Sequence, residues 1–294
     1  MPPSRSVDLP AEGAQRLHGR RVLVTGASSG IGAATARAIA AAGGRVALVA
    51  RSTERLDSLA AEIEAATGGA GTAPDTGEAD TAPATASAEH PSPRAVALPA
   101  DIVDPTAATA AVDHAADLLG GLDAVVNAAG VARPGPVATT PPDDWQLMLD
   151  VNVRGLLHVT QAALPHLAAA AEAGGEEDAR SRAADIVNVS SMSGRRVGSP
   201  PMGVYAASKA AVHALSGALR AEVGGEGIRV SVIAPGFVRT GIFDQQDTDA
   251  ARQLGRKGDE VGLPPEQVAD RIVEVLSAPA GVVHVEVAMV SIDQ

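Results

Sequence analysis

The chain has 294 residues, a formal net charge of -12 and an aromatic content of only 1%. Its length allows one large domain or two small ones, and a negative chain with so few aromatic side chains is not expected to bind nucleic acid. The sequence has no cysteine, no apolar run long enough to cross a membrane and no metal-ligand spacing among its seven histidines, which predicts a cytoplasmic protein without disulfides, membrane partner or metal.

A glycine-rich segment between a predicted strand and a predicted helix is the first informative feature. Residues 1–18 are rich in proline and polar side chains, and we expect a flexible N-terminal arm there. The run 21–24 predicts a strand, and an alanine-rich helix is predicted to end at Ala42. Between them lies Thr25-Gly26-Ala27-Ser28-Ser29-Gly30-Ile31-Gly32, in which glycines let the backbone approach a phosphate and the helix start offers free N–H groups. A dinucleotide site is therefore predicted, with a simple tight turn as the alternative.

The end of the second predicted strand bears on which dinucleotide is bound. The strand over 45–50 completes a βαβ unit and is followed by Arg51. In NAD-binding units of this kind an acidic residue contacts the ribose 2′-hydroxyl, whereas an arginine can pair with a 2′-phosphate. Arg51 therefore favours NADP(H), while NAD(H) remains possible, and a solvated arginine at a helix start is the alternative.

Two segments of biased composition interrupt the alternation of strands and helices. An amphipathic helix is predicted over 53–66, but residues 68–94 are mostly Gly, Ala, Thr, Pro, Ser and acidic, without a hydrophobic period. Because strand and helix patterns resume directly afterwards, we interpret 68–94 as a low-complexity surface insertion rather than a linker between domains. The Glu-, Gly- and Arg-rich stretch 172–184 predicts a second, solvated insertion.

The next predicted strand, 95–100, ends at an acidic residue. The carboxylate of Asp101 could accept a hydrogen bond from an adenine amino group. A helix is predicted to follow, with Asp104 as its cap and Pro105 in its first turn.

Small residues follow the strand after that one. A strand predicted over 123–126 ends in Asn127-Ala128-Ala129-Gly130, whose small side chains allow a flat cofactor to lie against the backbone. A long helical region is then predicted over 145–164 and contains Asn152. Since an asparagine inside a helix usually lowers stability slightly, Asn152 invites a specific role.

The stretch 186–209 carries the strongest candidates for chemistry. A buried strand predicted over 186–189 ends in Ser190-Ser191, and a helix is predicted to start near Tyr205. Tyr205 and Lys209 are then four residues apart on one helix face, about 6 Å along the axis. A nearby ammonium favours the phenolate, so we expect Lys209, in a dry site and helped by the charge of a bound cofactor, to lower the pKa of Tyr205. A half-exposed surface pair is the alternative.

The remaining segments complete the alternation of strands and helices. A strand predicted over 228–234 is closed by Pro235-Gly236. The polar and irregular stretch 237–262, with isolated apolar anchors, suits a mobile lid that excludes water from a site. A helix over 264–277 and a last strand over 282–290 are expected to follow.

Taken together, these segments resemble the short-chain dehydrogenase/reductase family. The motifs that carry the resemblance occur in the family's order: Thr25-Gly26-x3-Gly30-Ile31-Gly32, Asn127-Ala128-Ala129-Gly130, Asn152, Ser191, Tyr205-x3-Lys209 and Pro235-Gly236. The match covers 21–290 apart from the two insertions. It implies a single Rossmann-like domain over 19–294, with a doubly wound α/β fold, a seven-stranded parallel sheet and helices on both faces. A homodimer or homotetramer is expected by the same analogy.

The resemblance further implies an NADP(H)-dependent oxidoreductase that transfers a hydride between the nicotinamide and a small aldehyde, ketone or secondary alcohol. Tyr205 would be the general acid or base, and Lys209 would lower its pKa and hold the nicotinamide ribose. Ser191, with Ser193 as the alternative, would polarise the carbonyl. Asn152 would position a water in the proton relay. The implied cofactor-binding residues are Gly26, Ser28, Ser29, Gly30, Ile31, Gly32, Arg51, Asp101, Ile102, Asn127, Ala128, Gly130, Tyr205, Lys209, Pro235, Gly236, Val238 and Thr240.

The implied substrate pocket is mostly apolar, and Arg195 is its one candidate anchor for a substrate carboxylate. Besides lid residues, it would be formed by Met192, Arg195, Val197, Met202 and Phe237. Two other functions stay open: a dinucleotide-binding sensor or scaffold without turnover, and an epimerase or dehydratase on the same fold. The complete set of catalytic residue types argues against the sensor.

Overall fold

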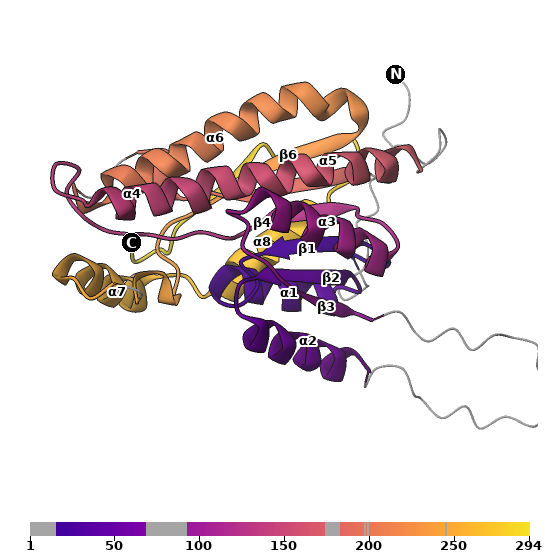
Figure 1. Ribbon diagram of the computed structural model, residues 1–294, viewed down its shortest axis with the longest axis horizontal. Coiled ribbons are helices and arrows are strands. Elements are labelled where there is room, and N and C mark those ends of the chain that lie inside the picture. The colour runs from indigo at the N-terminus through magenta and orange to yellow at the C-terminus, as the bar shows by residue number, and fades with distance from the viewer. Residues whose placement is uncertain (1–15, 69–92, 174–182, 197, 199, 245) are drawn as a thin grey trace, which may run out of the picture.

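Figure 1 shows the computed structural model, which describes residues 16–68, 93–173, 183–196, 198, 200–244 and 246–294. Most of the predicted N-terminal arm and of the two predicted insertions lies outside the described residues. The same holds for Val197, which the sequence suggests as a substrate contact. Among the described residues, no helix is long and apolar enough to cross a membrane.

In the described part of the chain, seven parallel strands form one sheet in the order β3-β2-β1-β4-β5-β6-β7. The strands are β1 Arg21–Thr25, β2 Arg45–Ala50, β3 Ala95–Pro99, β4 Ala124–Asn127, β5 Ala184–Val189, β6 Ile228–Pro235 and β7 Glu286–Met289. The order reverses between β1 and β4, and in open α/β sheets ligands bind outside the carboxyl ends of the strands at such a point. The predicted doubly wound α/β fold is confirmed.

Helices cover both faces of this sheet (Figure 1). They are α1 Gly30–Ala41, α2 Thr53–Gly68, α3 Pro105–Leu119, α4 Pro142–Leu149, α5 Leu156–Glu172, α6 Gly203–Val223, α7 Asp249–Val261 and α8 Pro265–Leu276. One core joins α1, α2 and α8 to the sheet, and a second joins α3, α5 and the end of α6 to the opposite face. Along β1, Val22 and Val24 enter the first core and Leu23 the second, as the two-residue period of a strand requires. Burial on both faces explains why the central strands are continuous apolar runs.

The long helical region predicted over 145–164 is present, but it is not one regular α-helix. The chain forms α4, then a π-helical turn over Asp150–Gly155, then α5. A π turn widens the helix by one residue and commonly occurs at functional sites. Asn152 lies in this turn, so the residue that is unusual for a helix marks the place where the regular helix is interrupted.

The segment 237–262, predicted to be irregular, is largely helical. It contains a short 3₁₀ turn over Gly241–Phe243 and the helix α7, which Thr248 caps by accepting a hydrogen bond from the Ala251 N–H. The apolar residues of α7 are few and widely spaced, so they form one narrow buried stripe on an otherwise polar helix. That composition hid the helix from a search for apolar runs.

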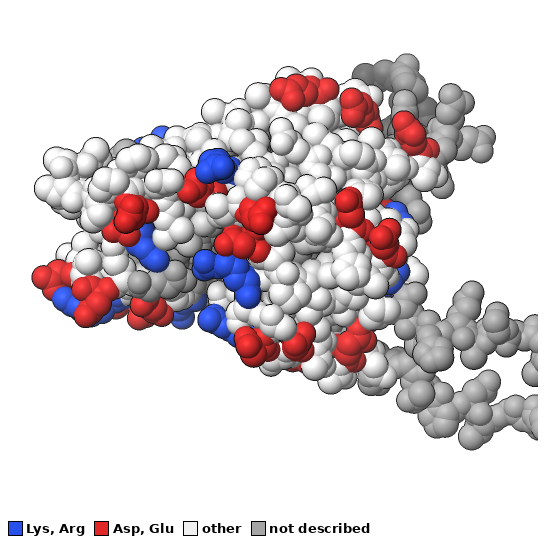
Figure 2. All heavy atoms as spheres, in the orientation of Figure 1, with Lys and Arg blue, Asp and Glu red and all other residues white. Residues whose placement is uncertain are grey.

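The last strand is shorter than predicted. Only Glu286–Met289 pairs with β6, whereas Val282, Val283 and Val285 stay substantially exposed before it. Figure 2 shows the face of Figure 1 with acidic and basic side chains interspersed, so the described part of that face carries no continuous basic band.

Candidate active site

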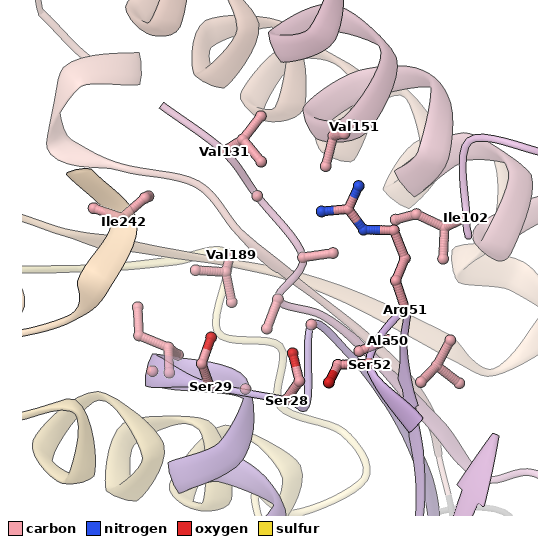
Figure 3. A pocket seen from close by; sticks show the side chains of 18 of the residues that line it. Ser28, Ser29, Ala50, Arg51, Ser52, Ile102, Val131, Val151, Val189 and Ile242 are labelled. Carbon is pink, nitrogen blue, oxygen red and sulfur yellow. The ribbon is translucent and has the colours of Figure 1, made fainter. Parts of the chain in front are cut away.

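A cavity of about 380 Å³ opens at the carboxyl ends of the strands, where the order of the sheet reverses (Figure 3). Its walls come from the glycine-rich loop and the start of α1, from the end of β2 and the start of α2, and from the residues after β3 and β4. The π turn, the end of β5, the start of α6 and the segment after β6 complete them. The described lining residues are Gly26, Ser28, Ser29, Gly30, Ile31, Gly32, Val49, Ala50, Arg51, Ser52, Arg55, Ala100, Asp101, Ile102, Val103, Ala128, Ala129, Gly130, Val131, Leu147, Asp150, Val151, Val189, Tyr205, Lys209, Thr240, Gly241 and Ile242.

The glycine-rich loop is packed so closely that side chains would not fit. Gly26 has a φ of 68°, and a Cβ there would lie 2.7 Å from Ala129 Cα. A Cβ on Gly32 would lie 2.3 Å from the Gly26 carbonyl oxygen, so α1 starts directly against the loop. Ser29, the N-cap residue of α1, makes no side-chain capping hydrogen bond, which leaves the first amides of α1 for another acceptor. The loop and the cavity together fit a dinucleotide diphosphate.

Two arginines line the cavity at the end of β2. Figure 3 shows the Arg51 side chain rising from the end of β2 into the cavity, with Ser28 and Ser52 near its base. Arg55, one helical turn further along in α2, lines the same cavity. Arg55 was not among the predicted cofactor residues, because Arg51 precedes α2 and the sequence alone does not show that the two side chains share one cavity.

Tyr205 and Lys209 lie at the start of α6, and both are buried. The Lys209 Nζ is 5.9 Å from the centre of the Tyr205 ring and donates a hydrogen bond to the Val189 carbonyl at 2.9 Å. Burial raises the pKa of Tyr205 to about 12, against the opposing effect of hydrogen bonding to the Ser191 side chain. Burial also lowers the pKa of Lys209 to about 8. Burial therefore sets the tyrosine pKa in the protein without dinucleotide, and the lowering expected with a bound cofactor stays a prediction.

Asn152 is 1% exposed, and its side chain joins three segments of the site. Its Nδ2 donates to the Val131 carbonyl and to Ser208 Oγ, both at 3.0 Å. Its Oδ1 accepts from the Val131 N–H at 2.8 Å. Both amide N–H groups are therefore used inside the protein. Ser208, which stands between Tyr205 and Lys209, was not among the predicted site residues.

Most of the predicted cofactor residues line the cavity, but four do not. Asn127 is buried and donates to Thr160 Oγ1 and Asn188 Oδ1, so it links β4 to α5 and β5. The other three lie at the end of β6 and in the loop after it, outside the described lining: Pro235, Gly236 and Val238. Thr240, two residues further on, does line the cavity, and its methyl group would lie 3.0 Å from a Cβ on Gly30.

The predicted substrate residues are divided between two places. Met202 and Phe237 pack in the same apolar cluster as Tyr205. Ser191 caps a 3₁₀ turn that begins at Met192. Arg195, the suggested carboxylate anchor, instead forms an ion pair with Glu286 of β7, with Nε 3.1 Å from Oε1, and is outside the described cavity lining. The strand β7 supplies this partner from far along the chain, which local sequence could not reveal.

The lining near Tyr205 includes residues that sequence reasoning missed. These are Val131, Leu147, Val151 and Val189, whereas Gly241 and Ile242 belong to the predicted lid. The four missed residues are apolar and follow no motif, so only the fold identifies them. Within the described ranges, no group of three or more His, Asp or Glu side chains is placed to hold a metal ion.

Comparison with known proteins decides the family. A family model described as "short chain dehydrogenase" matches residues 20–76 and 68–251. The chain belongs to the short-chain dehydrogenase/reductase family. The enzyme is therefore an NAD(P)-dependent oxidoreductase.

Relatives at about one-third identity span nearly the whole enzyme. It is 32% identical to glycine betaine reductase ATRR of Emericella nidulans over 97% of its length, but it spans only 20% of that protein. An uncharacterized oxidoreductase of Staphylococcus haemolyticus is 32% identical, with 94% of the enzyme and 97% of the relative covered. The crystal structure of a short-chain dehydrogenase from Burkholderia cenocepacia in complex with NADP matches with a TM-score of 0.71 and 32% identity, covering 93% and 97% of the two chains.

Proposed function

We propose that the enzyme transfers a hydride between NADP(H) and a small aldehyde, ketone or secondary alcohol, with Tyr205 as the general acid or base. The observation that carries the proposal is that one cavity is lined by the glycine-rich loop, by Arg51 and by the buried pair of Tyr205 and Lys209. The proposed dinucleotide site and proton donor therefore share one cavity.

The preference for NADP(H) follows from charge at the end of β2. Arg51 and Arg55 would bind the 2′-phosphate, with the Ser28 and Ser52 hydroxyls as further donors. The first amides of α1 would hold the diphosphate. NADP bound to the relative from Burkholderia cenocepacia supports the same assignment.

The bound nicotinamide would supply or accept the hydride. Tyr205 has a pKa of about 12 in the protein alone, so at neutral pH it holds the proton that a carbonyl oxygen needs during reduction. Oxidation of an alcohol requires the phenolate instead, and the Lys209 ammonium would stabilise it in this dry site. Ser191 interacts with the phenol and would donate a hydrogen bond to the same substrate oxygen.

Asn152 contributes to proton transfer through its backbone. Both N–H groups of the Asn152 side chain already donate hydrogen bonds inside the protein. A water of the proton relay would therefore bind the backbone carbonyl of Asn152, which lies in a π turn where helical hydrogen bonding is altered. Gly130 lies between this turn and Lys209: a Cβ there would be 3.3 Å from both Asn152 Oδ1 and Lys209 Nζ. A larger residue would separate the two.

The substrate end of the cavity favours uncharged, apolar groups. Val131, Leu147 and Ile242 line it, and the apolar cluster around Tyr205 lies behind them. The segment 237–262 would act as the lid, since Gly241 and Ile242 form part of the wall. Because Arg195 is paired with a residue of β7, it is not placed to bind a substrate carboxylate, and the substrate does not need to carry one.

The proposal is tested by following oxidation of NADPH and NADH against a panel of aldehydes, ketones and 3-oxo acids. We expect turnover of neutral carbonyl compounds with NADPH, and a loss in Tyr205→Phe of about 10²- to 10⁴-fold in kcat. Arg51→Ala should raise KM for NADPH and leave KM for NADH unchanged. NADPH binding without turnover on any substrate would favour the sensor, and full activity of Tyr205→Phe would refute the assigned chemistry.

A further inference from the structure

We propose that Ser208 is a positioning residue, which holds the backbone of Tyr205 in register with Asn152 and so fixes the place of the phenol in the cavity. The inference rests on the proposed function, because it assumes that Tyr205 transfers the proton. Ser208 itself is outside the described cavity lining and touches no substrate.

Ser208 makes two hydrogen bonds that run in one direction. Its Oγ accepts from Asn152 Nδ2 at 3.0 Å and donates to the Tyr205 carbonyl at 2.7 Å. Asn152 is in turn fixed by two hydrogen bonds with the Val131 backbone. A continuous chain of hydrogen bonds therefore joins the segment after β4, the π turn and α6.

These three segments are also walls of the cavity. Val131 lines it after β4, Val151 lines it beside Asn152, and Tyr205 lines it at the start of α6. Ser208 is fully buried, so no water replaces a lost hydroxyl easily. Removing the hydroxyl would leave an N–H of Asn152 unpaired and free α6 to shift relative to the π turn. In enzymes, a misplacement of about 1 Å can cost roughly 100-fold in rate.

The chain offers a matched control in Ser216, two turns further along the same helix. Ser216 is also fully buried, donates to the Val212 carbonyl at 2.6 Å and accepts from Asn188 Nδ2 at 2.9 Å. Each serine thus joins a helix carbonyl to a buried asparagine. Only the hydrogen bonds of Ser208 reach Tyr205 and the π turn.

The test compares Ser208→Ala with Ser216→Ala in the full chain. Steady-state kcat and KM, the pH profile of kcat, Kd for NADPH and the thermal midpoint are measured for both. We expect similar losses of Tm and little change in Kd for either variant. Only Ser208→Ala should lower kcat, by about 10- to 100-fold, and shift its pH profile. Ser208→Thr, which keeps the hydroxyl, should recover most of that loss.

Equal kcat values in the two alanine variants would overturn the inference. If Ser208→Ala does not fold, Ser208→Cys takes its place, because the thiol has a similar volume but forms only weak hydrogen bonds. The kcat of Ser208→Cys is then compared with that of Ser208→Thr, and equal values would overturn the inference. The proposed function fails separately: full activity of Tyr205→Phe removes it whatever Ser208 does. An inactive Tyr205→Phe beside a fully active Ser208→Ala removes only the inference.

Discussion

The Lys209 ammonium costs the fold stability, and Lys209→Met should recover part of it. Lys209 is only 4% exposed, and burial lowers its pKa from 10.5 to about 8 with no compensating charge as a cause. A shift of that size corresponds to about 3 kcal/mol against the charged form at pH 7. The hydrogen bond to the Val189 carbonyl returns roughly 1 kcal/mol. Methionine has a similar length but carries neither the buried charge nor the hydrogen bond, so the free energy of unfolding should rise by about 1–2 kcal/mol.

The pH dependence gives the sign of this effect. Because the folded pKa of Lys209 lies below the unfolded one, the unfolded state binds more protons between about pH 8 and 10.5. The stability of the unsubstituted enzyme should rise across that window relative to Lys209→Met, and the gap between them should shrink. Urea unfolding of the two proteins without dinucleotide, at pH 7, 8, 9 and 10, measures the free energy of unfolding of each and the gap between them. A Lys209→Met variant that is less stable than the unsubstituted enzyme at pH 7, or a stability gap that does not change with pH, would refute the reasoning. The Lys209→Met variant should be inactive whatever its stability.

Three other substitutions test the fold and the cofactor site. Asp185→Asn should lower the free energy of unfolding by about 3–5 kcal/mol, because the buried carboxylate accepts two hydrogen bonds from Arg229. Urea unfolding measures this change, and a loss under about 1 kcal/mol would contradict the prediction. Gly32→Ala should weaken NADPH binding in a fluorescence titration, since the added Cβ would lie 2.3 Å from the Gly26 carbonyl oxygen. Asp104→Ala should cost about 1 kcal/mol of stability, through loss of the cap of α3, with NADPH affinity unchanged.

The sequence predicted well those features that depend on neighbouring residues. The strand over 45–50 is β2 with the predicted bounds, because a strand buried on both faces needs a continuous apolar run. Asp104 caps α3 as expected, since a cap and the amides it satisfies lie within one turn. The glycine-rich loop was recognisable because only glycine permits the close approaches that Gly26 and Gly32 make.

Features that depend on distant segments could not be predicted in this way. Arg195 looked like a pocket residue until β7 supplied Glu286 as its partner. Burial raises the pKa of Tyr205 in the protein without dinucleotide, and the sequence shows the nearby lysine but not how deeply the phenol is buried. In each case the missing quantity was a long-range contact or the exclusion of water, neither of which the spacing of residues contains.

The buried polar groups behind the cavity explain why the site has one arrangement. Asn127, Asn188 and Ser216 form one hydrogen-bonded chain across β4, β5 and α6, and Asn152 and Ser208 form another between the π turn and α6. A buried amide that loses its partner costs about 1–3 kcal/mol, so a shift of α6 would break several such bonds at once. Apolar packing alone tolerates small shifts of a helix more easily. The two polar chains therefore restrict α6 to one register, and that register brings the tyrosine, the lysine and the glycine-rich loop to the same cavity.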